Sequence, residues 1–384
     1  LDTNFARGAG ANGAIYVVRH QSDGKVVIGG DFTSYDEQPR SRLVRLLSNG
    51  ELDTSFFTGS GFDGPVHLVD FQSDGKILVG GSFTSYNDIG RKYLVRLLPD
   101  GTYDFSYRIP TGASGPVYTL YVGSDSLIYA GGNSSFYFAE HVPFLVRLLP
   151  DGKRDTSFHT GTGPNGPVWL VTGSKEGTLM IGGEFTAYDG RPANRVARLY
   201  PNGALDTSFQ SNINTGAIYT LLSLANGSIL IGGTFYHVEG GRPYSGIARL
   251  FPNGRLDTSF VPIRLPYFGI STVRSLHLLA DSSILVGITL QQSTSSVSYV
   301  GRLLRGGEWD STFVGPAMNG TIYTITSQPD GKILIGGDFT LCDSFSCYGI
   351  VRLLPKGAID STFQVGAGID GFQRSVYAIL ELIS

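Results

Sequence analysis

Carboxylates that follow glycine pairs are the side chains of this sequence with the clearest capacity for chemistry. Asp31, Glu184 and Asp338 each come directly after the last glycine of an apolar segment that recurs along the chain. Two carboxylates facing each other across a cleft can act as acid and base in the hydrolysis of a glycosidic bond. A solvated strand end is the simpler interpretation. A carbohydrate-active enzyme that depends on an acid such as Glu184 is therefore only our third-ranked function.

Other catalytic and metal-binding patterns have little support. The sequence contains no Gly-x-Ser-x-Gly, no His-Glu-x-x-His and no nucleotide-binding loop, and its six histidines are scattered. Asp23, Asp74 and Asp330 stand in identical Asp-Gly-Lys steps, each with one carboxylate where a calcium loop needs several oxygen ligands. A hairpin turn explains these steps. We expect no catalytic residue, no metal and no cofactor, with calcium as a minor alternative.

The sequence contains two cysteines, Cys342 and Cys347, five residues apart. No further cysteine or nearby histidine completes a zinc site. A local disulfide is one interpretation if the protein resides in an oxidising compartment, and two free thiols in a loop are the other.

Aromatic residues gather in the loops that follow the glycine pairs. The best binding candidates are those without a counterpart in other repeats: Phe136, Tyr137, Phe138, Tyr236 and His237. Aromatic faces beside carboxylates and amides suit sugar rings, which offer an apolar face and a fringe of hydroxyl groups. Tyrosines that recur at one position, such as Tyr35, Tyr86 and Tyr188, are more simply explained as packing residues.

An arginine followed eight residues later by an aspartate recurs seven times, and this regularity favours a structural role. The pairs include Arg45 with Asp53, Arg198 with Asp206, and Arg249 with Asp257. If residues 48–50 form a three-residue turn, Arg45 and Asp53 lie opposite each other and form an ion pair. A two-residue turn would place them on opposite faces. We expect the ion pair.

The composition narrows the class of protein. The chain has 384 residues with 53 Gly, 41% hydrophobic and 16% charged residues, which excludes disorder, coiled coils and collagen. The net charge is −3 and the sequence has no block of like charge, so it does not predict a basic surface that would bind nucleic acid. Apolar runs are too short to span a membrane. Since the chain opens on Leu1 without a leader, we expect a mature or excised piece.

A repeat of about 51 residues runs through the whole chain. Its Leu-Asp-Thr-Ser-Phe-like signature has its aspartate at positions 2, 53, 104, 155, 206, 257, 310 and 360. In the first unit we predict strands over residues 14–20, 26–30 and 42–47, and a short fourth strand over 52–56. Four short strands in about 50 residues are typical of a β-propeller blade. The sequence predicts an all-β fold and one domain over residues 1–384.

The number of blades follows from counting the elements. The second strand and the Val-Arg-Leu-Leu strand each occur seven times, which predicts a seven-bladed propeller. The first strand and the signature occur eight times, so a terminal strand over residues 375–382 is surplus. This strand completes the last blade, caps an edge, or pairs with the next unit of a longer array.

Three linked motifs resemble those of the delta-60 repeat family of bacterial β-propellers. They are Gly-Gly-Asp-Phe-Thr-Ser-Tyr at 29–35, Gly-Gly-Glu-Phe-Thr-Ala-Tyr-Asp-Gly-Arg-Pro at 182–192, and Leu-Pro-Asp-Gly followed by Asp-Thr-Ser-Phe. The resemblance covers essentially the whole chain. It implies a secreted or cell-surface location within larger proteins, and it brings no catalytic motif. Tyr103 to Tyr107 and the Gly287–Ile288 step depart from the pattern, so we expect local changes in those blades.

We therefore expect a non-catalytic extracellular module that serves as a rigid structural, adhesive or protein-interaction element of a larger bacterial surface protein or filament. Its partners would be other protein domains or copies of a surface assembly, without nucleic acid and without membrane insertion. A glycan-binding propeller that uses the Tyr-rich loops is the alternative.

Overall fold

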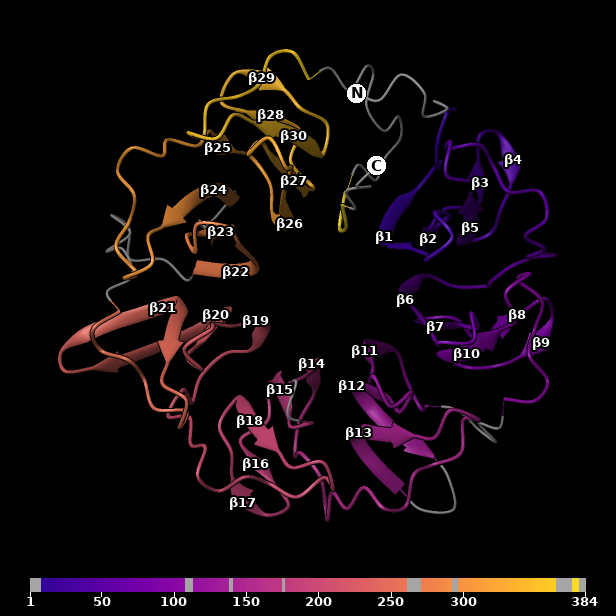
Figure 1. Cartoon of the computed structure of the whole chain (residues 1–384), viewed down its shortest axis with the longest axis horizontal. Coiled ribbons are helices and arrows are strands. Elements are labelled where there is room, and N and C mark those ends of the chain that lie inside the picture. The colour runs from indigo at the N-terminus through magenta and orange to yellow at the C-terminus, as the bar shows by residue number, and fades with distance from the viewer. Residues whose placement is uncertain are drawn as a thin grey trace. The chain divides into compact units, whose positions relative to one another are not determined.

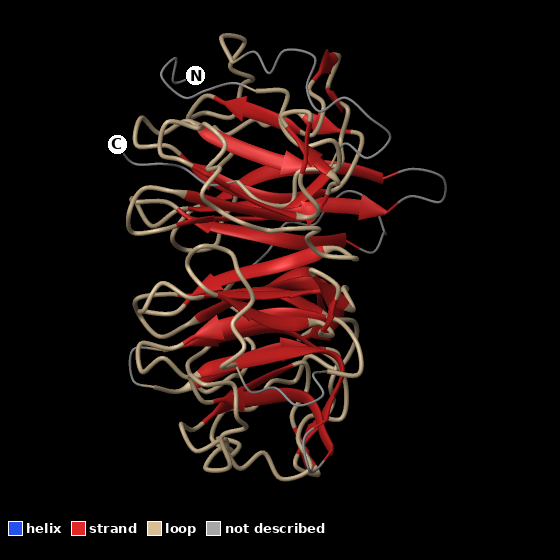
Figure 2. Cartoon of the chain, turned by 90° about the vertical axis from the view of Figure 1, so that its right-hand side faces the viewer, coloured by secondary structure: helices blue, strands red, loops and turns tan. Residues whose placement is uncertain are grey.

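The computed structural model describes residues 8–107, 113–137, 141–174, 177–260, 271–291, 296–363 and 375–379, with the backbone alone at 136, 137 and 141. This part of the chain consists of strands and loops (Figure 2), and none of it is a helix that could cross a membrane. The chain divides into two compact units. Unit 1 comprises Leu1–Ala193 and Ala197–Asp206, and unit 2 comprises Asn194–Val196 and Thr207–Ser384. The single-domain assignment remains a prediction.

Unit 1 contains four antiparallel three-stranded sheets, blades 1 to 4 (Figure 1). Their strands are β1 (Ala14–His20), β2 (Val26–Asp31) and β5 (Leu43–Leu46); β6 (Val66–Phe71), β7 (Ile77–Gly81) and β10 (Leu94–Leu97); β11 (Val117–Val122), β12 (Ile128–Tyr137) and β13 (His141–Leu148); and β14 (Val168–Gly173), β15 (Leu179–Gly183) and β18 (Val196–Leu199). The first strands are neighbours, since β6 contacts both β1 and β11, and β11 contacts β14.

Unit 2 contains three further sheets, blades 5 to 7. Their strands are β19 (Ile218–Ser223), β20 (Ile229–Glu239) and β21 (Arg242–Leu250); β22 (Ser271–Leu278), β23 (Ile284–Gln291) and β24 (Ser296–Leu303); and β26 (Ile322–Ser327), β27 (Ile333–Gly337) and β30 (Ile350–Leu353). Blade 6 continues through β25 (Ala317–Met318) into the small hairpin of β28 (Leu341–Cys342) and β29 (Phe345–Ser346). The predicted all-β class and the seven repeated sheets are confirmed.

The predicted fourth strand is wrong in every blade. In blade 1 the segment after β5 contributes one bridge, between Leu46 and Leu52. The chain then turns, because the Asp53 carboxylate accepts hydrogen bonds from the backbone N–H and the hydroxyl of Ser55, at 3.0 and 2.5 Å. A side chain that binds its own backbone two residues later competes with strand pairing. The signature is thus a turn and not a strand.

Small hairpins form where the sequence indicated a variable loop. In unit 1 they pair β3 (Ser34–Tyr35) with β4 (Gln38–Pro39), β8 (Ser85–Tyr86) with β9 (Ile89–Gly90), and β16 (Ala187–Tyr188) with β17 (Arg191–Pro192). Asp36 and Glu37 at the first tip both have positive φ, 49° and 61°, as a two-residue type I′ turn requires. In blades 3 and 5 the second and third strands instead extend through this region.

The glycine pair allows two close approaches. A Cβ at Gly29 would lie 2.5 Å from Cγ1 of Val66 on the next blade, and a Cβ at Gly30 would lie 2.0 Å from the carbonyl oxygen of Ala14. The missing side chain of the first glycine therefore leaves room for a side chain of the neighbouring blade. The missing side chain of the second leaves room for the backbone of the blade's own first strand. Blade 6 keeps the first glycine, Gly287, but has Ile288 in place of the second, and its three strands still form.

The core lies between successive blades. One cluster joins Val17, Val27 and Leu43 of blade 1 to Val66 and Val79 of blade 2, and all five side chains are buried. These two blades thus bury their apolar faces against each other, as expected for a repeat array.

The described part of the predicted surplus strand, residues 375–379, contains one bridge residue, Val376, and no continuous strand, and it packs on blade 7. Val376 donates its backbone N–H to the carbonyl oxygen of Gly337 at 2.8 Å, and a Cβ at Gly336 would lie 2.7 Å from its Cγ1. Ile322 of blade 7 has the same relation to Gly287 of blade 6, also at 2.7 Å. Val376 therefore occupies the place of a following blade's first strand. The signature at residue 2 lies outside the described residues.

Candidate functional site: an aromatic stripe on a scaffold of buried ion pairs

The recurring arginines and aspartates form ion pairs, which are buried in blades 1 to 3 and part-buried in blades 4 to 7. In all seven pairs the arginine Nε donates to the aspartate Oδ2 at 2.7–2.9 Å, including Arg45–Asp53, Arg198–Asp206 and Arg249–Asp257. In blade 1 the Leu47 N–H donates to the Glu51 carbonyl, which closes a three-residue turn over 48–50. The three-residue alternative is therefore the one observed, and it places Arg45 opposite Asp53.

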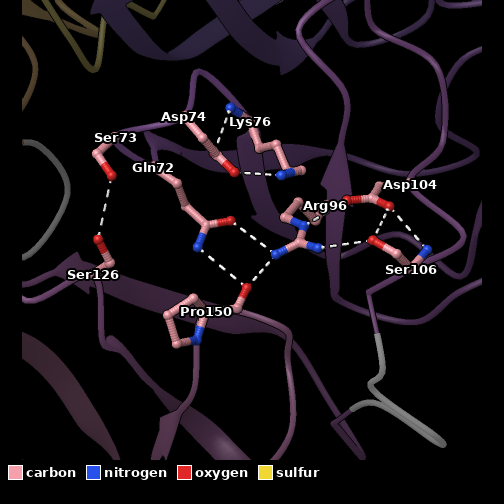
Figure 3. Close-up of polar contacts among 9 residues, drawn as sticks. All are labelled: Gln72, Ser73, Asp74, Lys76, Arg96, Asp104, Ser106, Ser126 and Pro150. Carbon is pink, nitrogen blue, oxygen red and sulfur yellow. Dashed lines mark hydrogen bonds and ion pairs between the residues drawn. The ribbon is translucent and has the colours of Figure 1, made fainter.

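The same arginines also bind the next blade, as Figure 3 shows for Arg96. Its guanidinium donates to Asp104, to the Gln72 amide oxygen at 3.0 Å, and to the backbone carbonyl of Pro150 in blade 3. Corresponding bonds join Arg45 to Pro99, Arg147 to Pro201, Arg249 to Gly306 and Arg302 to Pro355. The sequence predicted the pairs within a blade and missed these bonds between blades.

The aspartates are held in their charged form. Burial raises the pKa of Asp53, but hydrogen bonds from Ser55 and Arg45 outweigh burial and lower the pKa to about 2. The pKa of Asp104 is lowered for the same reasons. Arg45 also lies over the ring of Phe56, 4.5 Å from its centroid. Charge, hydrogen bonds and ring contact together fix each arginine, so these groups serve the scaffold.

A row of aromatic side chains lies on the first strands of unit 1. We call the rings of Tyr16, His67, Tyr118 and Trp169 the stripe. Successive ring centroids lie 5.0, 5.5 and 5.1 Å apart. In blades 2 to 4 the ring follows a valine that packs on a glycine of the preceding blade. The rings are half-buried or, at Tyr118, exposed. One continuous aromatic surface therefore extends over four blades.

Polar groups border the stripe. The residue after each glycine pair is Asp31, Ser82, Asn133 or Glu184, fifteen positions after the corresponding ring. His67 Nε2 lies 2.8 Å from the Ser82 hydroxyl, and Trp169 Nε1 donates to Glu184 Oε1 at 3.0 Å. The Asp31 carboxylate lies 3.3 Å from Arg42 Nε. Two of the three predicted rim acids thus lie at this border.

Unit 2 has a row at the same strand position, with Tyr219, Arg274, Tyr323 and Tyr377. The Arg274 guanidinium lies 4.5 Å from the ring centroid of Tyr219 and 5.9 Å from that of Tyr323. Tyr323 stacks on Tyr377 at 4.0 Å and donates its hydroxyl to Asp338 Oδ2 at 2.9 Å. The third rim acid therefore binds a ring of this row.

The predicted loop residues belong to two different units. Phe136 and Tyr137 belong to β12 of unit 1, and Phe138 lies outside the described residues. Tyr236 and His237 are consecutive in β20 of unit 2, so their side chains point to opposite faces of the sheet. Tyr236 is 54% exposed, whereas His237 Nε2 lies 3.3 Å from Glu239 Oε2.

The recurring loop tyrosines pack inside the protein. Tyr86 and Tyr188 are fully buried, and their hydroxyls donate to the carbonyls of Gly101 and Gly203 at 2.5 and 2.7 Å. This agrees with the packing interpretation of these residues.

Cys342 and Cys347 form a disulfide. Both sulfur-bearing residues are buried, and the bond lies across the hairpin of β28 and β29. The disulfide is the first of the two interpretations that the sequence left open.

The Asp-Gly-Lys steps are hairpin turns. Asp23, Asp74 and Asp330 each accept the backbone N–H of the lysine two residues later, at 3.1–3.2 Å. Over the described ranges, no group of three His, Cys, Asp or Glu side chains is arranged to hold a metal ion.

The stripe was the feature that sequence reasoning missed. An aromatic or His residue recurs directly after a β-branched residue near the start of the first strand in every blade but blade 6, as in Tyr16, His67 and Tyr118. Alone, each ring fits an ordinary half-buried strand position. The recurrence across repeats was the signal that would have found it, because repeat-equivalent positions of stacked blades lie side by side.

A family model described as "Domain of unknown function (DUF5122) beta-propeller" matches six segments, residues 21–56, 72–106, 124–158, 177–209, 224–260 and 328–363. These segments make up more than half of the chain. The stretch without a match includes blade 6, where Ile288 replaces the second glycine.

No curated protein matches the chain. Among solved structures, a protein of unknown function from Bacteroides caccae is 12% identical, with 87% of this chain and 91% of that chain covered and a TM-score of 0.36. A structure titled as the eukaryotic initiation factor is 9% identical, with 93% and 88% covered and a TM-score of 0.46. Neither likeness bears on function. The β-propeller prediction is confirmed by the repeated matches and the seven sheets, and the chain belongs to the DUF5122 beta-propeller family.

Proposed function

We propose that this propeller is a non-catalytic, rigid interaction module of a larger extracellular protein or filament. The observation that carries the proposal is that the repeated residues fall into two groups, one that holds the scaffold together and one that stays partly exposed. The recurring charged groups bind one another inside the scaffold, whereas the rings of the stripe keep part of their surface toward solvent. A scaffold with fixed rings presents a binding surface without ordering cost at the moment of binding.

Two observations support an extracellular location. The Cys342–Cys347 disulfide persists most readily in oxidising compartments. The motifs at residues 29–35 and 182–192 resemble the delta-60 repeats of bacterial surface proteins, and we include membership of that group in the proposal.

Glycan binding remains a second candidate at the β20–β21 hairpin, because Tyr236 there is more than half exposed. Binding of the purified chain on a glycan array, lost in Tyr236→Ala, would favour this candidate over a protein partner. A control variant with the same change is Tyr299→Ala, which removes an exposed tyrosine of β24 outside the hairpin.

A turnover assay tests the absence of catalysis. The chain is incubated with chromogenic glycosides and soluble polysaccharides, beside Glu184→Gln and the matched variant Glu51→Gln. We expect no product above the buffer rate from any of the three. Turnover by the wild type that is lost in Glu184→Gln and retained in Glu51→Gln would overturn the proposal in favour of an enzyme.

A further inference from the structure

Arg274 of β22 is the charged member of the aromatic row of unit 2. Its guanidinium lies over the ring of Tyr219, 4.5 Å from the centroid, and over the ring of Tyr323, 5.9 Å from the centroid. Arg274 is exposed, and both tyrosines are half-buried. Contacts with two rings hold the cation in place, so it loses little conformational freedom when it binds another group.

In the part of the chain that the structure describes, these two rings are the only groups that bind the guanidinium of Arg274. A guanidinium has five N–H donors, which form their strongest bonds with carboxylate or phosphate oxygens and not with rings. Arg249 of the preceding blade, by contrast, donates to Asp257 Oδ2 at 2.7 Å. The donors of Arg274 therefore stay open to solvent or to another molecule.

The repeat explains why Arg274 has no acceptor in its own blade. In three other blades the ring residue bonds to the residue fifteen positions later: His67 to Ser82, Trp169 to Glu184 and Tyr323 to Asp338. In blade 6 the residue at this position is Thr289, which is buried, and its hydroxyl lies 2.8 Å from that of Ser298. The hydroxyl of Thr289 thus serves the interior of the blade and not Arg274.

Asp338, the acid of this row, is also bound elsewhere. Its carboxylate accepts the Tyr323 hydroxyl at 2.9 Å and the backbone N–H of Thr321. Over the described residues it forms no ion pair with Arg274. An anion that neutralises Arg274 must therefore come from outside the described part of the chain.

We propose that Arg274 binds the carboxylate of an aspartate or glutamate in an acidic segment of a partner protein. This inference rests on the proposed function and specifies the partner's chemistry. The planar guanidinium matches a carboxylate through two parallel N–H···O bonds. Tyrosine and arginine are enriched among the residues that dominate the binding energy of protein interfaces, and this row combines Arg274 with three tyrosines. That composition favours a protein segment over an acidic glycan.

NMR titration of the isotope-labelled chain with two synthetic peptides tests the inference. One peptide contains four Glu-Gly repeats, and the other replaces glutamate by glutamine, which has the same length without charge. We expect the Nε–Hε signal of Arg274, assigned by its absence in Arg274→Lys, to shift with the glutamate peptide at low salt. The glutamine peptide should bind at least about tenfold more weakly. Because the chain has a net charge of −3, general attraction does not favour an acidic peptide.

Arg274→Lys keeps the charge and removes the planar fork, so it should weaken the binding of the glutamate peptide about fivefold, measured on backbone amide signals. The matched control is Arg255→Lys, the same change at an exposed position of unit 2 outside the row. It should leave the affinity unchanged, and thermal melting of each variant verifies folding.

Four outcomes would overturn the inference: equal loss in the two lysine variants, equal binding of both peptides, no shift of the Arg274 signal, or tighter binding of an oligogalacturonate than of the glutamate peptide. These outcomes leave the non-catalytic module standing, because that proposal fails on turnover that is lost in Glu184→Gln, which the titration does not measure.

Discussion

Arg96 in blade 2 donates a hydrogen bond to the backbone carbonyl of Pro150, which lies 54 residues later in blade 3. The same guanidinium forms the ion pair with Asp104 of its own blade. One side chain therefore connects two blades, and its loss would leave a buried carboxylate without its partner.

We predict that Arg96→Ala lowers the free energy of unfolding by about 3–5 kcal/mol, as is usual when one member of a buried ion pair is removed. Urea denaturation followed by circular dichroism measures the change. Arg191→Ala, at an exposed position of the same unit, should cost less than about 0.5 kcal/mol. Equal losses in the two variants would show that the buried network contributes nothing of its own.

Acid should destabilise the protein through the signature aspartates. The folded-state pKa of Asp53, about 2, lies below the ordinary value of 3.8, so its contribution is complete above that value. It is lost as the pH falls from about 4 towards 2. Denaturation midpoints measured across this window should fall, and Asp53→Asn should flatten the dependence. Asp23→Asn, at an exposed turn, should leave the slope unchanged, and a flat wild-type profile would contradict the prediction.

The third repeat offers a stabilising substitution. Tyr107 takes the place of the signature phenylalanine, is buried, and its hydroxyl has no hydrogen-bond partner among the described residues. Burying an unpaired hydroxyl costs about 1–3 kcal/mol. Tyr107→Phe should therefore raise the free energy of unfolding by about 1 kcal/mol. A loss of stability on removing the oxygen would show that the hydroxyl is bonded.

Gly29, which lies against the next blade, should not tolerate an added methyl group. A Cβ at Gly29 would lie within 2.5 Å of Val66 and 2.8 Å of Val17, both in the buried core. Overpacking of this kind costs about 1–3 kcal/mol. Gly29→Ala should therefore lower the thermal midpoint, whereas Gly90→Ala, with open space around its Cβ, should not. A midpoint unchanged in Gly29→Ala would mean that the blades separate easily.

The disulfide should contribute modestly, because it closes a short loop. For a loop of this length the chain-entropy model gives about 2 kcal/mol. Reduction with dithiothreitol should lower the stability of the wild type by this amount and should leave the Cys342→Ala, Cys347→Ala double variant unaffected. Thiol titration before reduction checks the bond directly, and two reactive thiols in the folded protein would contradict it.

Much of the fold could be predicted from the sequence because its signals are local and repeated. Residues 14–20 form a run rich in β-branched and aromatic residues, and a glycine turn follows them, so β1 was placed with its observed ends. The strand predicted over the signature at 52–56 was wrong because the Asp53 carboxylate accepts a hydrogen bond from the Ser55 N–H, which competes with strand pairing.

The candidate site was harder to predict, since it depends on which residues become neighbours in space. Tyr16 and His67 are 51 positions apart in the sequence and have ring centroids 5.0 Å apart in the fold. Recurrence at one position did identify Tyr86 as a packing residue, and its ring is fully buried with its hydroxyl donating to the Gly101 carbonyl. The contacts between the rings of different repeats needed the fold.

The joint between blades has a consequence for how such arrays can grow. Blades 2, 3 and 6 each carry both halves of the joint: a close-packed glycine and an arginine donor towards the following blade, and a β-branched residue and a turn carbonyl towards the preceding one. A duplicated repeat therefore arrives already matched to both of its neighbours. Gene duplication of such a repeat would preserve the contacts on both of its sides, so the array could change its length by whole blades.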